Sequence, residues 1–318
     1  MKKDKQFKIV NPPTRVKYKK FCKRIRENFH KQYISYVDNN ATINLHRLME
    51  ILATKLKPKV NDSFARHKKY TIRDYVNGII EILRNGRYWS RYNGLIKGNT
   101  LNKKHNDFCK WGVYECLYRI ILCEYFSKNK FSKLHFQSID STFIPNLYGT
   151  ELCGRCKKYG YKKGIKLNFV VESHGVPISI AIAPANRYDN VITKEQLQHE
   201  YLIDTGTKHV KNNNRFKQIV TADAAYHDQN LAKIMAKKGF KLYTDVNIRN
   251  TKNPEKLKIL DAVKKEYKKR QSKRLVSEHC NAWIKQYPKM DKVIEKTIRS
   301  FVGLLLLSLS HIVSGKIK

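Results

Sequence analysis

Acidic residues are scarce in this sequence. Its 318 residues include 26 Asp and Glu against 65 Lys and Arg, which leaves a formal net charge of +39. The excess runs from end to end, with "RVKYKKFCKRIRENFHK" early in the chain and "KLKILDAVKKEYKKRQSKR" late. Solubility does not require so much charge, so we expect the chain to bind a polyanion over much of its surface.

Long hydrophobic runs are also missing. The start, "MKKDKQFKIVNPP", has charges but no apolar stretch behind them, so we expect no secretory signal and an intracellular protein, cytoplasmic and at the nucleoid if the host is bacterial. The one strongly apolar stretch, residues 301–313, is too short to cross a bilayer and is interrupted by Gly303 and His311. We expect a buried helix there and no membrane partner.

Cysteines are few and do not suggest a disulfide framework. Their odd total of 7 favours reduced thiols. Cys109, Cys116 and Cys123 have a spacing that favours packing along one helix face. "CGRC" at residues 153–156 could be half of a zinc site, but no second ligand pair follows at a usable distance, so a turn is the preferred interpretation.

The period of the hydrophobic residues changes near residue 132. Before it, apolar residues recur at helical spacing, as in the stripe Ile72, Val76, Ile79, Ile80 and Leu83. After it they alternate, and the predicted order is β-β-β-α-β-α-β-α, ending in a helix from about residue 261 to 287. The sequence therefore predicts two domains, a basic helical region at 1–132 and an α/β domain at 133–318.

Two of the predicted strands end in aspartate, at Asp140 and Asp223. Neighbouring strand ends hold the ligand sites of open α/β sheets, and two carboxylates there repel each other unless a cation lies between them. Glu278, on the last predicted helix, would complete an oxygen-rich site for magnesium or manganese. Arg274 and Lys285 would share its helix face and hold phosphates. Such a two-metal site supports in-line displacement at phosphorus.

Simpler roles exist for the same acids. An aspartate at a strand end commonly caps a helix or forms a turn, and Glu278 could be the i,i+4 partner of Arg274. Three other aspartates are alternative ligands: Asp189, Asp228 and Asp245. Of these, Asp228 suits a helix cap best.

Three stretches resemble a known family: "IDST" at 139–142, "TADAAYHD" at 221–228 and "RLVSEHCNAWIK" at 274–285. They are similar to the motifs of DDE transposases of the bacterial insertion-sequence type, in the group numbered four and five. The last stretch keeps the family spacing of Arg, three residues, Glu, six residues and Lys. Similar segments elsewhere extend the resemblance over most of the chain from about residue 65.

The resemblance implies a ribonuclease H-like catalytic domain, with a mixed five-stranded sheet and helices, preceded by a helical DNA-binding region. It implies that Asp140, Asp223 and Glu278 form the catalytic triad and bind two Mg²⁺ or Mn²⁺ ions. The DNA-binding residues that it implies are Arg274, Lys285, Tyr226, Lys163 and Lys166.

The sequence departs from the family pattern at two places. Gln271 stands where the family often has a Tyr, which puts a stacking role near the DNA end in doubt. Ala224 and Ala225 replace the common Lys and Gly before Tyr226. Neither change removes a metal ligand.

The implied partners are double-stranded DNA, as terminal inverted repeats and as target, and a second copy of the chain in a homodimer. The implied reaction is phosphodiester cleavage at the element ends followed by strand transfer. Two other functions fit the same residues: a transposase-derived DNA-binding protein without activity, and a ribonuclease H-like nuclease or resolvase, which would not join DNA ends.

Overall fold

The structure, a computed structural model, describes residues 8–10, 44–58, 70–128, 136–198, 218–246, 253–291 and 293–317. The chain divides into two compact units. The sheet unit comprises residues 1–17, 129–144 and 152–282, and the helical unit comprises 18–128, 145–151 and 283–318. The predicted boundary near residue 132 is therefore one of several crossings between the units. The basic stretch at residues 15–31 lies outside the described residues.

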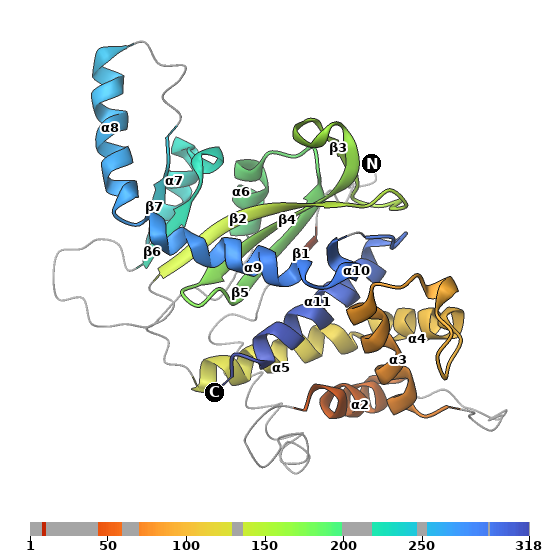
Figure 1. Cartoon of the computed structure of the whole chain (residues 1–318). Coiled ribbons are helices and arrows are strands. Elements are labelled where there is room, and N and C mark those ends of the chain that lie inside the picture. The colour runs from red at the N-terminus through yellow and green to blue at the C-terminus, as the bar shows by residue number, and fades with distance from the viewer. Residues whose placement is uncertain are drawn as a thin grey trace. The chain divides into compact units, whose positions relative to one another are not determined.

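The sheet unit is built on a mixed sheet (Figure 1). The described residues contribute seven strands to it: β1 (Lys8–Val10), β2 (Phe136–Pro145), β3 (Gly154–Cys156), β4 (Lys162–Glu172), β5 (Pro177–Pro184), β6 (Gln218–Ala222) and β7 (Phe240–Thr244). They are ordered β1-β5-β4-β2-β6-β7, with β3 paired to β4. β6 runs parallel to both β2 and β7, whereas β5 is antiparallel to β4 and β1.

The strands at the centre of the sheet are almost wholly buried because helices cover both faces. Every residue of β5 from Pro177 to Ala183 is buried. A tight hairpin joins β4 and β5: Gly175 takes a φ of 79°, and its N–H donates to the Glu172 carbonyl over 2.8 Å. "CGRC" forms the short strand β3 rather than the predicted turn, and its two cysteines are free.

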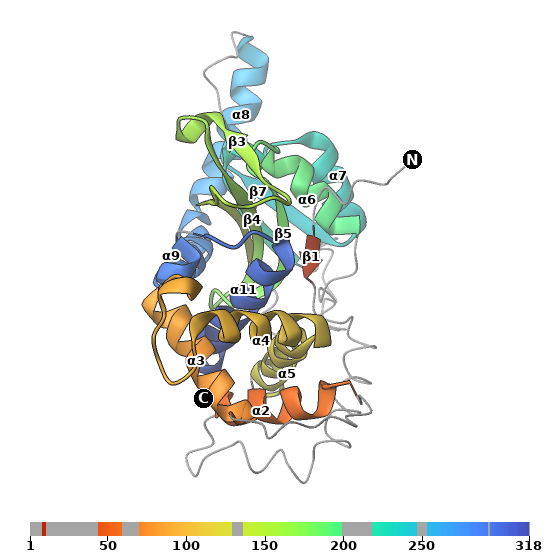
Figure 2. The same cartoon turned by 90° about the vertical axis from the view of Figure 1, so that its right-hand side faces the viewer.

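The helices of the sheet unit lie on both faces of the sheet. α6 (Asp189–Gln198) and α7 (Gln229–Lys237) lie on one face, and α9 (Leu275–Lys285), which belongs to this unit as far as Ala282, crosses the other (Figure 2). Asp228 caps α7 as predicted, by accepting the Leu231 N–H over 2.8 Å. The cap residue therefore predicted the start of α7 correctly.

The last predicted helix of the sheet unit is in fact two helices. α8 (Pro254–Lys268) ends before a short 3₁₀ turn, Gln271–Arg274, and α9 follows. Arg270 leaves helical geometry, with φ −122° and ψ 1°, and its guanidinium lies 4.1 Å from the centre of the Tyr243 ring. The prediction of one continuous helix was wrong because this tertiary contact interrupts a helical sequence pattern.

The helical unit contains α2 (Leu45–Leu56), α3 (Ile72–Asn85), α4 (Gly98–Trp111), α5 (Val113–Lys128), α10 (Pro288–Asp291) and α11 (Ile298–Ser314). α3 begins with a capping box of Thr71 and Asp74 and ends at Gly86, which is in a left-handed conformation. Gly112, with φ 74°, separates α4 from α5. α11 is the predicted buried helix, and it packs against α4 and α5. Its apolar surface on all sides explains why the C-terminal segment joins this unit.

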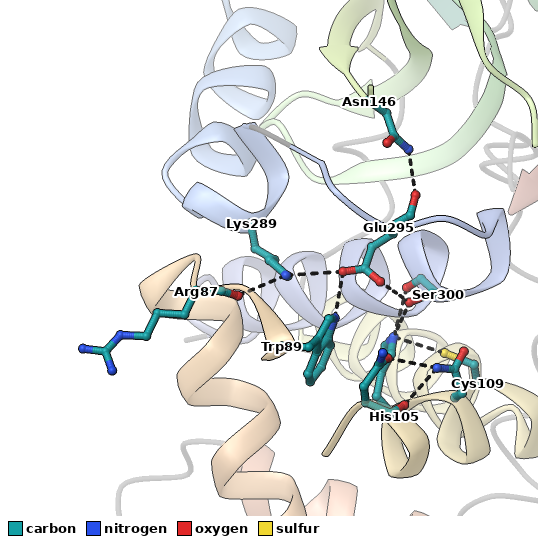
Figure 3. A network of polar contacts seen from close by, with 10 residues as sticks. Arg87, Trp89, His105, Cys109, Asn146, Lys289, Glu295 and Ser300 are labelled. Atoms are coloured by element: carbon teal, nitrogen blue, oxygen red, sulfur yellow. Dashed lines mark hydrogen bonds and ion pairs between the residues drawn. The ribbon is translucent and has the colours of Figure 1, made fainter. Parts of the chain in front are cut away.

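The helical unit encloses a network of polar side chains, here called the buried network (Figure 3). Glu295 accepts from the Trp89 indole N–H at 2.9 Å and pairs with the Lys289 ammonium at 3.4 Å. The Ser300 hydroxyl donates to its second oxygen. His105 donates from Nε2 to the Ser300 carbonyl at 3.1 Å, and its Nδ1 therefore accepts from the Tyr114 hydroxyl at 2.7 Å, so the tautomer is fixed.

None of the described helices is long and apolar enough to span a membrane. Among the described residues, five cysteines are outside disulfides: Cys109, Cys116, Cys153, Cys156 and Cys280. Cys123 is disulfide-bonded, so the expectation of reduced thiols does not hold for it.

Candidate active site

Asp140 and Asp223 lie beside each other on neighbouring strands. β2 and β6 are parallel, with Ser138 opposite Thr221, and each aspartate is two residues further along its own strand direction. Because side chains alternate along a strand, both aspartates project to the same face as that pair. Asp223 directly follows β6 as predicted, whereas Asp140 lies in the middle of β2 rather than at its end, because β2 continues to Pro145.

The two carboxylates are held where negative charge is disfavoured. Burial, followed by the negative charge of Asp223, raises the pKa of Asp140 to about 6, although the Ser141 N–H and Arg274 oppose the shift. Burial also raises the pKa of Asp223, against the bond that its carboxylate accepts from the Ala225 N–H at 2.9 Å. A bound cation would relieve this repulsion.

α9 is docked onto the strand that carries Asp140. The Ser138 hydroxyl donates to the Ser277 hydroxyl over 3.0 Å, and the Asn281 side-chain amide donates to Asp140 Oδ2 over 2.9 Å. The Asn281 carbonyl oxygen is buried without a hydrogen-bond partner. Sequence reasoning missed Asn281, although it lies three residues after Glu278 on the same helix and so shares its face.

Glu278 does not complete a metal cluster in this structure. It forms an ion pair with Arg274, the i,i+4 partner that the sequence offered as the simpler interpretation. Within the described parts of the chain, no three acid, His or Cys side chains are close enough to hold one ion. Glu278 is nevertheless near enough for its charge to raise the pKa of Asp140. Lys285 is the exposed last residue of α9 and belongs to the helical unit.

Asp189 is a further carboxylate at this site. At the start of α6 it accepts from the Ser141 hydroxyl at 2.6 Å and pairs with the Lys166 ammonium at 2.9 Å. Its charge contributes to the raised pKa of Asp223. The two other alternative ligands have local roles: Asp228 caps α7, and Asp245 accepts the N–H of Val246.

The predicted DNA-binding residues differ in accessibility. Tyr226 is 1% exposed, and its hydroxyl donates to Asn168 Oδ1 over 2.7 Å, so it is placed to support the site rather than to touch DNA. Asp140, Asp189 and Asp223 are all close enough to contribute to the raised pKa of Tyr226, although burial contributes most. Lys166 is held by Asp189, whereas Lys163 is half-buried on β4. The prediction of a direct DNA contact therefore needs correction for Tyr226, because its ring fills the core.

The donor set suits a divalent cation. Carboxylate oxygens are the ligands that Mg²⁺ and Mn²⁺ prefer, and two of them lie side by side with raised pKa values. The unpartnered Asn281 carbonyl oxygen is another hard donor next to Asp140. These residues fit a metal ion held by the pair, with Glu278 outside it in its present ion pair.

Comparison with known proteins gives the family. A transposase in a piggyBac synaptic complex with hairpin DNA, solved by cryo-EM, is 14% identical to this chain, with a TM-score of 0.41. The match covers 87% of this chain and 66% of that one. No fold or function is assigned from a likeness this low. No protein with a curated description matches the chain. The family model named transposase DDE domain matches residues 132–312, more than half of the chain. The region matched includes Asp140, Asp223 and α9, and the chain belongs to the transposase DDE domain family.

Proposed function

We propose that this chain is a DNA transposase, which cleaves DNA at the ends of an insertion element and joins those ends to target DNA in a metal-dependent reaction. The observation that carries the proposal is the pair of half-buried carboxylates, Asp140 on β2 and Asp223 directly after the parallel neighbour β6, in a chain of this family. The sheet order β5-β4-β2-β6-β7, with the first aspartate on the central strand, supports a ribonuclease H-like fold.

The residues around the pair have distinct roles in this proposal. Asp140 and Asp223 would hold Mg²⁺ or Mn²⁺, and Glu278 would be the third carboxylate of a two-ion site. Bound ions of this kind activate a water or a 3′ hydroxyl and stabilise the leaving oxygen. The Ser141 N–H and the Asn281 amide orient Asp140, and the Ala225 N–H orients Asp223.

Arg274 controls the third carboxylate in this proposal. Guanidinium groups bind phosphate at two points, so a DNA phosphate near α9 competes with Glu278 for Arg274. Glu278 is then free to turn toward Asp140. On this basis Glu278→Gln abolishes cleavage and leaves DNA affinity within about twofold, because the phosphate contacts that dominate affinity remain. Cleavage by Glu278→Gln at the wild-type rate contradicts this role.

The proposed partners follow from charge and family. Double-stranded DNA, as terminal inverted repeats and as target, matches the net charge of +39. A homodimer would hold both element ends at once. Arg274, Lys163 and Lys285 are the proposed direct DNA contacts. Lys166 and Tyr226 instead position the site, Lys166 through its ion pair with Asp189 and Tyr226 through its bond to Asn168.

The test is nicking and joining of a supercoiled plasmid that carries the DNA flanking this gene, with Mg²⁺ or Mn²⁺. Asp140→Asn and Asp223→Asn should each lower both activities on the order of a thousandfold, since metal stabilisation of the transition state contributes several kcal/mol. Asp228→Asn is the matched control, because asparagine also caps a helix and this residue is outside the pair. Joining that survives in Asp140→Asn would contradict the proposal.

A second candidate is a transposase-derived protein that binds DNA without cutting it. The ion pair that occupies Glu278 favours it. Tight DNA binding by the wild type without cleavage in either metal would support this candidate. Cleavage without joining would instead indicate a nuclease or resolvase.

A further inference from the structure

A basic hairpin extends from the sheet unit between Gly154 and Lys163. It consists of β3, a 3₁₀ turn at Lys157–Tyr159 and the start of β4. Between residues 152 and 171 the chain has no acidic residue. The hairpin itself carries five cations: Arg155, Lys157, Lys158, Lys162 and Lys163. Two tyrosines lie among them, Tyr159 at 43% exposed and Tyr161 at 59% exposed.

The basic hairpin is fixed to the strand of Asp140 rather than loosely attached. A Cβ at Gly164 would lie 2.6 Å from the Phe143 ring and would also collide with the Ile144 carbonyl, so β4 lies tightly beside this part of its neighbouring strand β2. The ring of Tyr159 stacks on Phe143, with centroids 4.5 Å apart and planes 13° from parallel. Phe143 is three residues beyond Asp140 on β2. The hairpin is therefore held at a set position relative to the carboxylates.

Tyr161 has a backbone conformation that its side chain does not favour. Its φ is 56°, in the left-handed region where a glycine would be at ease. The Arg155 guanidinium donates to the Tyr161 carbonyl over 3.3 Å and helps to hold the turn. The residue before it, with φ 64°, is indeed a glycine, Gly160. A bulky, strained and exposed residue at such a place points to a function for the side chain.

The hairpin lies close to the acid pair. The charge of Lys158 is near enough to Asp223 to oppose the rise of its pKa. The phosphate of a DNA strand that reaches Asp223 thus comes within the field of the hairpin's cations. Bases in a duplex are already stacked on each other, whereas an unpaired base has a free face that an exposed tyrosine ring can cover.

We propose that the basic hairpin binds the DNA strand next to the cleaved phosphodiester and that an unpaired base stacks on Tyr161. The lysines hold the phosphates on either side, and the strained backbone presents the ring. This inference rests on the proposed function, since it takes DNA as the ligand of the neighbouring carboxylates. It adds the form of DNA, locally unpaired, that the site selects.

The test compares binding of two DNAs of about 40 base pairs from the region flanking the gene. One is fully paired, and the other has about two unpaired bases at the element end. Fluorescence anisotropy without added metal measures the affinities, so no cleavage is needed. The wild type should bind the unpaired DNA about tenfold more tightly. Tyr161→Ala should reduce that ratio to about one, and Tyr161→Phe should keep it, because the ring is what stacks.

Tyr161→Gly separates binding from folding. Glycine relieves the strain at φ 56°, so this variant should unfold at the same or higher urea concentration while losing the preference for unpaired DNA. Tyr148→Ala, at an exposed tyrosine outside the hairpin, is the matched control and should leave the ratio unchanged.

Four results would overturn the inference. An unchanged ratio in Tyr161→Gly removes the stacking role, and an equal loss in Tyr148→Ala removes its specificity to the hairpin. Equal wild-type binding to both DNAs overturns the preference for unpaired bases but leaves the proposed function standing. Failure of the wild type to bind either DNA overturns both proposals together.

Discussion

The buried network of the helical unit removes a carboxylate from water and the acid site of the sheet unit removes two of them in part, with opposite outcomes. Glu295 in the buried network receives hydrogen bonds from Trp89 and Ser300 and the charge of Lys289. Asp140 instead faces a second aspartate, and burial with this repulsion raises its pKa to about 6. A buried acid with its own partners is structural, because loss of a partner leaves an uncompensated charge, whereas acids set against each other leave room for a cation.

The largest expected effect on stability is in the buried network. Glu295→Gln removes the carboxylate from Lys289, which is 1% exposed and would keep an uncompensated charge. We expect a loss of about 3–5 kcal/mol in the free energy of unfolding, measured by urea denaturation. The double variant Glu295→Gln, Lys289→Met should recover much of that loss. A single variant as stable as the wild type would show that the pair is not structural.

His105 should make the same network sensitive to acid. Burial lowers its pKa to about 4, so between that value and the ordinary 6.5 the unfolded chain binds a proton that the folded chain does not. Stability contributed by the neutral ring is therefore complete above about pH 6.5 and is lost as the pH falls toward 4, by about 3 kcal/mol in total. Urea unfolding at several pH values should show that the free energy of unfolding depends less on pH in His105→Asn than in the wild type. His46→Asn, at a half-buried histidine of α2, should retain the wild-type slope.

The smallest predicted effect has the opposite sign and lies in the acid site. Asp140→Asn removes a charge that burial and Asp223 disfavour, and asparagine can still accept from the Asn281 amide. We expect the free energy of unfolding at pH 7 to rise by about 1–3 kcal/mol in the absence of metal. Added Mg²⁺ should stabilise the wild type more than this variant. A destabilised Asp140→Asn would mean that the aspartate is structural, as Glu295 is.

Local features of the chain could be read from its residues. Caps at Gly86 and Asp228, the hairpin at Gly175 and the buried C-terminal helix all depend on short stretches whose chemistry is self-contained. The adjacency of Asp140 and Asp223 was also within reach, since acids near the ends of hydrophobic strands in an α/β order commonly meet.

The partners of the long helices could not be read in this way. The residues from 254 to 285 have a continuous helical pattern, yet Arg270 breaks it by stacking on Tyr243 of a distant strand. Asn281 was missed because an asparagine in a helix gives no sign of what it faces. Tyr226 was taken for a DNA contact because the motif alone does not tell whether a ring points into the core or out of it.

The sequence by itself determined the basic charge, most helix and strand types and the choice of Asp140 and Asp223 as candidate ligands, because these depend on composition and on neighbours a few residues apart. Only the tertiary structure decided that the C-terminal segment joins the helical unit, that Glu278 is paired with Arg274 and that the basic hairpin is fixed over β2. Each of these depends on which distant surfaces pack together. The sequence pattern alone does not tell which of the chain's many apolar faces pack against each other.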